Sequence, residues 1–266
     1  MPTRDSAPLG APCWIDLATT DAAGGRAFYS ELLGWTAEEP SEEFEGYWMF
    51  SRNGVPVAGG MPSQPGQSVP NVWTVYLATD DATKTLESVT EHGGRVQLSA
   101  MPVADLGTMA IVTDPGGAVV GLWEPRQFPG FTVLGEAGAP GWFELLTRDY
   151  EATVAFYREA LRWDAHPMSD TPEFRYTTLG QGETMAAGIM DATGFLPEGA
   201  PAHWSVYFGV DDTDAALAKV VELGGSVVRP AEDTPYGRLA TATDPAGAAF
   251  KLVGPNEAMP ARGSSS

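Results

Sequence analysis

Residues 11–34 read APCWIDLATTDAAGGRAFYSELLG, and residues 139–162 read APGWFELLTRDYEATVAFYREALR. The two stretches align without a gap, and the matched residues are Trp14 with Trp142, Asp16 with Glu144, Asp21 with Asp149, and Phe28-Tyr29 with Phe156-Tyr157. Chance does not produce so many matches at one spacing. The chain is therefore a tandem duplication.

Each copy begins with the pattern of a β-strand that has two different faces. Apolar residues alternate with Trp14 and then Asp16, and the second copy repeats this order with Trp142 and Glu144. Because successive side chains on a strand point to opposite faces, one face is apolar and the other carries an aromatic ring followed by a carboxylate. A purely structural strand would usually place that carboxylate in water. The second face is therefore a candidate for lining a cavity.

The remaining sequence predicts four modules of the same kind. In the first module, a helix begins at Asp21 and ends at Gly34, and three short strands follow, the last two joined by an Asn53-Gly54 turn. The order strand, helix and three strands then recurs three times, so the predicted fold class is α+β with four βαβββ modules. The expected organisation is a disordered tail at 1–10, a domain at 11–125, a linker at 126–140, a domain at 141–255 and a second tail at 256–266.

Composition limits the kinds of partner. The 266 residues carry a formal net charge of −20, which repels phosphate groups, so we expect no nucleic-acid partner. No apolar run reaches about 18 residues and no signal peptide is evident, so we expect no membrane association and a cytoplasmic location. The single cysteine, Cys13, excludes an internal disulfide and cysteine-based zinc sites. The expected partner is a small molecule, and the expected state is a monomer or a homodimer.

The chain resembles the vicinal oxygen chelate superfamily, which includes glyoxalases, bleomycin-resistance proteins and extradiol dioxygenases. The resemblance covers residues 11–255 and rests on four features: the first strand leading into Asp21, the Phe-Tyr pair followed by LLGW, the strand-Asp-Asp-helix-Gly-Gly run at 72–94, and the Asp-Pro-Gly-Gly turn at 114–117. Each feature returns in the second half. More narrowly, the chain is similar to tandem-domain actinobacterial members labelled glyoxalase-like or hydroxylase. The resemblance implies that each pair of modules forms a curved mixed sheet around a cavity.

The resemblance also implies three metal-ligand positions in each half, which are Trp14, Thr74 and Gly121 in the first and Trp142, Ser205 and Lys251 in the second. None of the six is a His, Glu, Asp, Gln or Cys, whereas a divalent metal requires three or four converging donor atoms. We therefore expect no metal and none of the family's metal-dependent chemistry. No glycine-rich phosphate loop follows a strand, so we expect no flavin or nicotinamide cofactor either.

Strand alternation predicts what lines the first cavity, namely Trp14, Asp16, Thr74, Tyr76 and Trp123 around a gap left by Gly121. Such rings suit a planar, partly polar ligand. In the alternative interpretation the same rings fill a collapsed cavity. If the cavity is open, we expect it to be roomier than the second one and to bind an aromatic molecule between Trp14 and Trp123. Because Lys251 takes the place of Gly121, we expect the second cavity to be smaller or to favour an anionic group.

The second cavity is expected to gather Trp142, Glu144, His203, Ser205, Tyr207 and Lys251. Its titratable groups, together with Asp16 of the first cavity, are candidates for acid–base catalysis. Alternatively, Lys251 and Glu144 form only an ion pair, and His203 is a solvated residue at the start of a strand. Two functions remain: a metal-independent enzyme of secondary metabolism that acts on an aromatic or polyketide-like molecule, or a protein that sequesters such a molecule without reaction.

Overall fold

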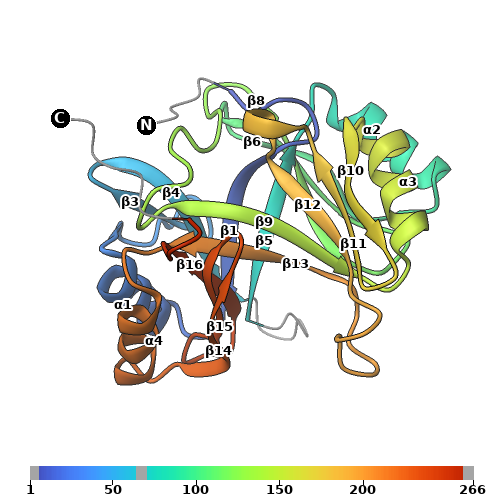
Figure 1. Ribbon diagram of the computed structural model, residues 1–266. Coiled ribbons are helices and arrows are strands. Elements are labelled where there is room, and N and C mark those ends of the chain that lie inside the picture. The colour runs from blue at the N-terminus through green and yellow to red at the C-terminus, as the bar shows by residue number, and fades with distance from the viewer. Residues whose placement is uncertain (1–5, 64–70, 260–266) are drawn as a thin grey trace.

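The computed structural model describes residues 6–63 and 71–259 and contains two eight-stranded mixed sheets, one from each half of the chain (Figure 1). The first sheet has the order β2-β3-β4-β1-β5-β8-β7-β6 and consists of β1 (Pro12–Thr19), β2 (Thr36–Ala37), β3 (Trp48–Arg52), β4 (Val55–Pro62), β5 (Val72–Ala78), β6 (Arg95–Val103), β7 (Gly107–Thr113) and β8 (Val119–Pro125). The second has the order β10-β11-β12-β9-β13-β16-β15-β14 and consists of β9 (Pro140–Thr147), β10 (Ala165–Thr171), β11 (Phe174–Leu179), β12 (Ala187–Asp191), β13 (His203–Gly209), β14 (Ser226–Thr234), β15 (Gly237–Thr243) and β16 (Ala249–Gly254).

Each βαβββ module supplies half of a sheet, and the two modules of a half join through antiparallel pairing of β1 with β5 or of β9 with β13. The helices are α1 (Ala22–Leu33), α2 (Ala82–Glu91), α3 (Tyr150–Leu161) and α4 (Thr213–Glu222), with a 3₁₀ turn η1 (Gly182–Thr184). The predicted α+β class and the four βαβββ modules are confirmed, and the modules pair within each half.

Local sequence signals set the ends of α1 and α3. The Asp21 carboxylate accepts a hydrogen bond from the Gly24 N–H at the start of α1, and Gly34 ends that helix with a φ of 69°. A left-handed residue costs least when it is glycine. Arg162 takes the same role after α3 with a φ of 57°, so the second copy keeps the stop without the glycine.

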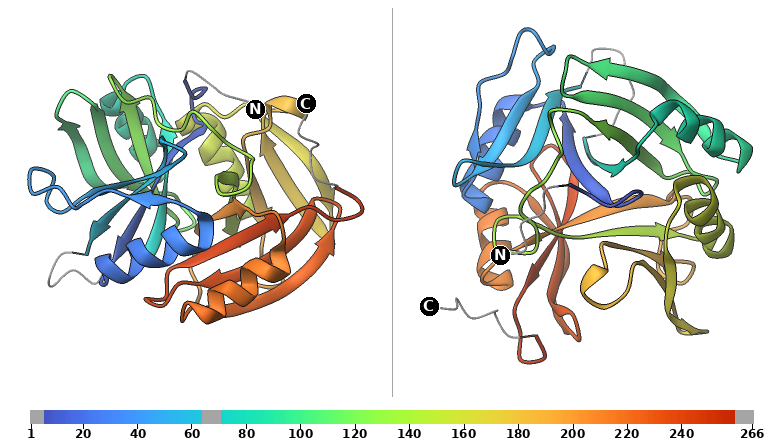
Figure 2. Two further views of the ribbon diagram at one scale, coloured as in Figure 1. Left: turned by 90° about the vertical axis from the view of Figure 1, so that its left-hand side faces the viewer. Right: turned by 90° about the horizontal axis from the view of Figure 1, so that it is seen from above.

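Each sheet has a helix face and a second face, which we call the inner face. On the helix face of the first sheet, Leu17 packs beneath Gly25 of α1, and Ile15 and Val75 are fully buried. The inner face carries the residues of opposite parity. Both sheets are curved, and the helices pair across the duplication, with α1 beside α4 and α2 beside α3 (Figure 2). This arrangement leaves the two inner faces as the places where a ligand can meet the sheets.

The two halves are joined by a reciprocal hydrogen-bond relay. Trp73 donates its indole N–H to the Tyr29 hydroxyl, which donates to the Asp244 carboxylate of the other half. The second half repeats the relay in the opposite direction, from Trp204 through Tyr157 to Asp114. The duplicated Phe-Tyr pairs therefore serve the contact between the halves. They do not reach the inner faces.

Of the tails expected at 1–10 and 256–266, residues 1–5 and 260–266 lie outside the described residues, and some of the remaining residues contact the sheets. Gly10 is buried, donates its N–H to the Ala78 carbonyl and accepts from the Trp163 indole. At the other end, the Asn256 side chain donates to the Thr234 carbonyl. These hydrogen bonds hold Gly10 and Asn256 against the sheets. The segment between the sheets is also held, because Phe131 donates its N–H to the Cys13 carbonyl.

Candidate functional site

The inner face of the first sheet is organised in rows that cross the strands. One row comprises Trp14, Tyr76, Gly121, Ile111 and Leu98. Asp16 and Thr74 lie opposite each other in the neighbouring row. Of the three positions that the resemblance implies for metal ligands, Trp14 and Gly121 share a row, and Thr74 lies one row away beside Asp16.

Asp16 is the centre of a buried polar cluster. Its Oδ1 accepts hydrogen bonds from the Trp14 indole at 3.0 Å and from the Tyr47 hydroxyl at 2.9 Å, and the Tyr76 hydroxyl is a further donor. Burial raises the pKa of Asp16 to about 6, and the hydrogen bonds from Tyr47, Tyr76 and Trp14 act in the opposite direction. This carboxyl group can therefore gain or lose a proton near neutral pH.

The space expected at Gly121 is filled by the protein itself. A β-carbon at residue 121 would overlap the Tyr76 ring, which lies directly over the glycine. Phe128, from the segment between the sheets, contacts both tryptophans edge-on, with ring centroids 4.8 Å from Trp14 and 6.2 Å from Trp123. Trp123 also donates its indole N–H to the Phe128 carbonyl. Phe128 thus lies where a ligand was expected between Trp14 and Trp123. In this part of the face the aromatic rings fill the cavity, as in the alternative interpretation.

Beyond Phe128 the first inner face is apolar and only partly covered. The residues concerned, all of inner-face parity and partly or largely exposed, are Met49, Met61, Leu98, Met101, Met109 and Ile111. Leu98 and Met101 on the edge strand β6 are 37% and 44% exposed. Apolar side chains held half in water on a curved sheet are the surface that an apolar ligand would cover.

The second inner face is built around Glu144. Its Oε1 accepts from the Tyr176 hydroxyl at 3.0 Å, and its Oε2 accepts from the Tyr207 hydroxyl at 2.8 Å and from Lys251 Nζ at 2.6 Å. Trp142 donates its indole N–H to the Tyr176 hydroxyl. The ion pair given as an alternative in the sequence analysis is therefore present, with side-chain exposures of 14% for Lys251 and 8% for Glu144.

Two other predicted residues of this face lie at different distances from the cluster. Ser205 is the cross-strand neighbour of Glu144, so it lies beside the carboxylate. His203 lies one row further out, is exposed, and has its Nδ1 3.1 Å from the Pro201 carbonyl. The expectation that His203 joins the cluster is therefore wrong; the alternative of a solvated residue at the start of the strand holds.

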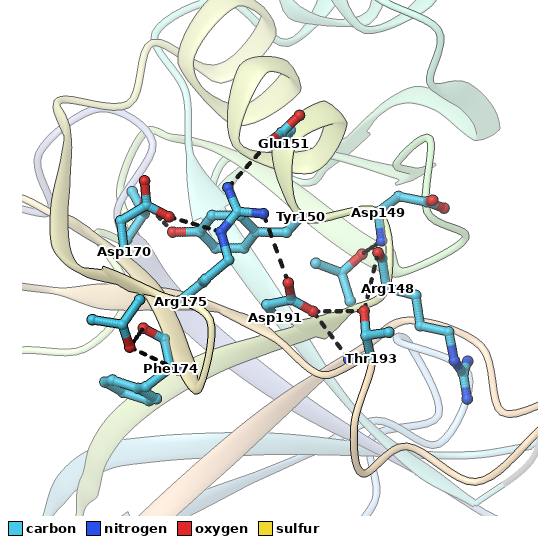
Figure 3. Close-up of polar contacts among 12 residues, drawn as sticks. Arg148, Asp149, Tyr150, Glu151, Asp170, Phe174, Arg175, Asp191 and Thr193 are labelled. Atoms are coloured by element: carbon cyan, nitrogen blue, oxygen red, sulfur yellow. Dashed lines mark hydrogen bonds and ion pairs between the residues drawn. The ribbon is translucent and has the colours of Figure 1, made fainter.

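A separate hollow of about 210 Å³ lies on the helix face, between α3 and strands β10 and β11. It is lined by Arg175, which forms ion pairs with Asp170, Glu151 and Asp191 and stacks on the Tyr150 ring (Figure 3). Three carboxylates and an aromatic ring already contact the guanidinium. We therefore interpret this cluster as one that stabilises the fold. The inner faces remain the stronger candidates.

Several contributors to the inner faces were not predicted from the sequence. Tyr47 and Tyr176 stand twelve residues before Gly59 and Gly188 in both halves, and each packs against its glycine, so this repeated spacing is a signal that could have found them. Phe128 belongs to no repeat, and no pattern in the sequence points to its position.

The residues of the inner faces do not fit a divalent metal. Within residues 6–63 and 71–259, no three His, Cys, Asp or Glu side chains lie close enough together to hold one. On the first face phenol and indole donors surround the Asp16 carboxylate, and on the second face the Lys251 ammonium already binds Glu144. Such donor sets lack the three or four ligands that zinc, iron or manganese require.

We therefore expect the purified protein to carry no stoichiometric metal at these positions. Incubation with a chelator should shift its melting temperature by less than about 1 °C, because only a bound metal contributes linkage to the folded state. Elemental analysis and thermal unfolding with and without chelator test this. A stoichiometric metal whose removal lowers the melting temperature would contradict the expectation.

Comparison with known proteins relates both halves to one superfamily. Residues 13–122 match the Glyoxalase/Bleomycin resistance protein/Dioxygenase superfamily, and residues 142–253 match the Glyoxalase-like domain. The chain is 37% identical to CFP32 of Mycobacterium bovis, named as a proposed glyoxylase, over 96% of this chain and 98% of that protein. It is 38% identical to the anthracycline biosynthesis protein DnrV of Streptomyces peucetius, over 95% and 96%.

The fold is also found among solved structures. The Mn(II)-bound glyoxalase of Novosphingobium aromaticivorans superposes with a TM-score of 0.63 at 14% identity, over 92% of this chain and 82% of that one. Across the described ranges, none of the helices is both long and apolar enough to cross a membrane. The agreement of sequence, fold and relatives shows that the chain belongs to the Glyoxalase/Bleomycin resistance protein/Dioxygenase superfamily.

Proposed function

We propose that the protein binds a planar, largely apolar organic molecule on the first inner face and exchanges a proton with it through Asp16, without a metal. The observation that carries this proposal is the position of Asp16. Its carboxyl group has a pKa of about 6 and lies on the same inner face as the partly exposed apolar side chains. General acid–base groups work best when their pKa lies near the working pH.

The surroundings of Asp16 support a hydrogen-bonding ligand with an apolar body. Tyr47 is only partly buried, and its hydroxyl donates to Asp16, so a proton can pass between a ligand and Asp16 through this hydroxyl. Thr74, opposite Asp16, adds a second partly covered polar group. The exposed residues of β6 would cover the body of the ligand, and Phe128 would form the wall beside it.

The relatives support the class of molecule. Two proteins named for anthracycline biosynthesis align with this chain along nearly its whole length, which favours an aromatic polyketide as the ligand and secondary metabolism as the setting. A second candidate function is sequestration of the same ligand without reaction. It is favoured by the contacts of Tyr76, Tyr47 and Trp14 with Asp16, which leave the residue only 9% exposed.

Binding can be tested with 1,8-dihydroxyanthraquinone as the probe, read by quenching of tryptophan fluorescence. Leu98→Glu places a charge on the inner face and should weaken binding at least ten-fold, because the charge must be desolvated by the ligand. Val96→Glu is the matched control, since Val96 lies on the same edge strand, is 39% exposed and, across the register shift between Val96 and Leu98, pairs with Val112 of the helix face. Equal affinity of the two variants would contradict the assigned face.

Catalysis can be separated from sequestration with 1,8-dihydroxyanthrone, whose acidic carbon-bound protons exchange with deuterium. A general base contributes roughly 10²–10⁴-fold, so the wild-type protein should accelerate exchange and Asp16→Asn should lose at least ten-fold of that acceleration while retaining the probe. Anaerobic exchange followed by mass spectrometry gives the rate. If the probe binds but exchanges at the same rate in both proteins, the sequestration candidate is favoured.

A further inference from the structure

We infer that the second inner face is a separate binding site for an aromatic molecule that carries an anionic oxygen, a carboxylate or a phenolate, held by Lys251 and Arg229. The duplication makes the inference possible, because equivalent rows of the two inner faces can be compared residue by residue. In the first sheet the row is Trp14, Tyr76, Gly121, Ile111 and Leu98, and in the second it is Trp142, Tyr207, Lys251, Thr241 and Arg229.

The first two members of the row are conserved in kind between the halves, and the last three are not. Gly121, Ile111 and Leu98 make the outer part of the first row apolar. Lys251, Thr241 and Arg229 make the outer part of the second row cationic and hydrogen-bonding. The same backbone therefore presents opposite chemistry on its two copies, and an apolar molecule suited to the first face is poorly suited to the second.

The Lys251 ammonium has hydrogen-bonding capacity left for a ligand. It carries three N–H donors, and two of them are directed at Glu144 Oε2 and at the Tyr207 hydroxyl, at 2.6 and 3.0 Å. These two acceptors fix the ammonium over the centre of the sheet. The third donor is the one available to an oxygen of a bound molecule.

Arg229 supplies a positive charge that is not neutralised within the described part of the chain, whereas the charge of Lys251 is balanced by Glu144. It is exposed, and none of the ion pairs within the described ranges 6–63 and 71–259 uses it. Burial and the Glu144 carboxylate raise the pKa of Tyr207, and the positive charge of Arg229 acts in the opposite direction, which places the guanidinium within electrostatic reach of Tyr207. Glu232 faces the same side in the neighbouring row, opposite Leu239, and confines the positive field to the row of Arg229.

The spacing of the row matches one anionic group. Neighbouring strands lie about 4.8 Å apart, so the backbones of β16 and β14 are separated by roughly 10 Å, a gap that a lysine and an arginine side chain can close on one carboxylate. Thr241 lies between them and offers a hydroxyl. At the other end of the row, Trp142 is only partly buried, so its ring can contact the aromatic part of the ligand.

The test compares 2-naphthoate with the uncharged 2-naphthamide, read from the NMR shift of the Trp142 indole N–H. Wild-type protein should bind naphthoate at least ten-fold more tightly than naphthamide. Arg229→Gln should weaken naphthoate five- to ten-fold and leave naphthamide unchanged. Arg95→Gln is the matched control, because Arg95 lies on the corresponding edge strand of the first sheet and its loss changes the net charge equally.

A second variant tests Lys251 without leaving a buried charge. The double variant Glu144→Gln/Lys251→Met removes both partners of the ion pair and should reduce the preference for naphthoate, leaving the part that Arg229 supplies. Equal binding of the two probes by wild-type protein, or equal weakening by Arg229→Gln and Arg95→Gln, would overturn the inference. Arg229→Gln should bind dihydroxyanthraquinone like wild-type protein, so failure here is distinguishable from failure of the proposed function.

Discussion

Lys251→Met is expected to lower the free energy of unfolding by about 3 kcal/mol at pH 7, because it leaves Glu144 as an uncompensated charge in a nearly buried position. The Tyr176 and Tyr207 hydroxyls continue to donate to the carboxylate, but they carry no positive charge. Denaturant unfolding followed by circular dichroism measures the change.

The double variant Glu144→Gln/Lys251→Met is the control for this prediction. Removing both charges should recover most of the lost stability, since a buried pair replaced as a unit costs little. Lys251→Ala tests whether the lost methylene packing matters, and it should be at least as destabilising as Lys251→Met. If Lys251→Met is as stable as wild-type protein, the ammonium does not compensate Glu144 and the described network is wrong.

Asp16→Asn is expected to stabilise the protein at pH 8 by about 2 kcal/mol. The pKa of Asp16 is about 6 in the folded protein against an ordinary 3.8, so the folded state binds the proton more tightly than the unfolded state does. The contribution of Asp16 to the free energy of unfolding is therefore greatest below about pH 4. It falls as the pH rises to about 6 and stays lower above that pH. A shift of this size corresponds to about 3 kcal/mol, from which we subtract about 1 kcal/mol for the poorer hydrogen bonding of the amide.

The measurement is the free energy of unfolding of wild-type protein and Asp16→Asn from pH 4 to pH 8. Asp114 is the internal reference, because burial raises its pKa to about 6 as well and it is untouched by the substitution. In the variant, the free energy of unfolding should therefore still change with pH between pH 4 and pH 6, but less steeply than in wild-type protein. An unchanged slope in the variant would show that Asp16 does not titrate in this range.

The sequence predicted the features that follow from repetition and from strand alternation. Because the stretch around Trp14 and Asp16 returns around Trp142 and Glu144, the strands and the faces of their residues could be predicted from the sequence, whereas the pairing of the modules into sheets could not. Parity along β5 and β13 placed Tyr76 and Tyr207 on the inner faces, where the structure has them hydrogen-bonded to the carboxylates. Both results rest on regular backbone, for which one residue determines the direction of the next.

The parts that the sequence did not predict depend on register and on irregular segments. The offset between Trp14 and Thr74 is set by how β1 pairs with β5, and strand alternation gives the face of a residue but not its partner. Phe128 reaches the first inner face from a segment without periodicity, so neither its contact with Trp14 nor the filling of the space beside Gly121 could be deduced. The pairing of Tyr29 with Asp244 joins residues far apart in the sequence and required the arrangement of the two halves.

The two inner faces show how duplication places different side-chain chemistry on one backbone. The first copy has an apolar row with the protonatable carboxyl of Asp16 in the neighbouring row. The second copy has Lys251 in place of Gly121, and Lys251 forms an ion pair with Glu144. The shared tryptophan, tyrosine and carboxylate positions form a polar cluster in both. A ligand should therefore discriminate strongly between the two copies.

A crystal structure of the protein with 1,8-dihydroxyanthraquinone tests the central claim most directly. We predict that the ring system lies on the first inner face, against Leu98 and Ile111, with an oxygen within hydrogen-bond distance of Tyr47, Thr74 or Asp16. Density for the probe on the second inner face or in the hollow beside Arg175, with the first face bare, would contradict the account.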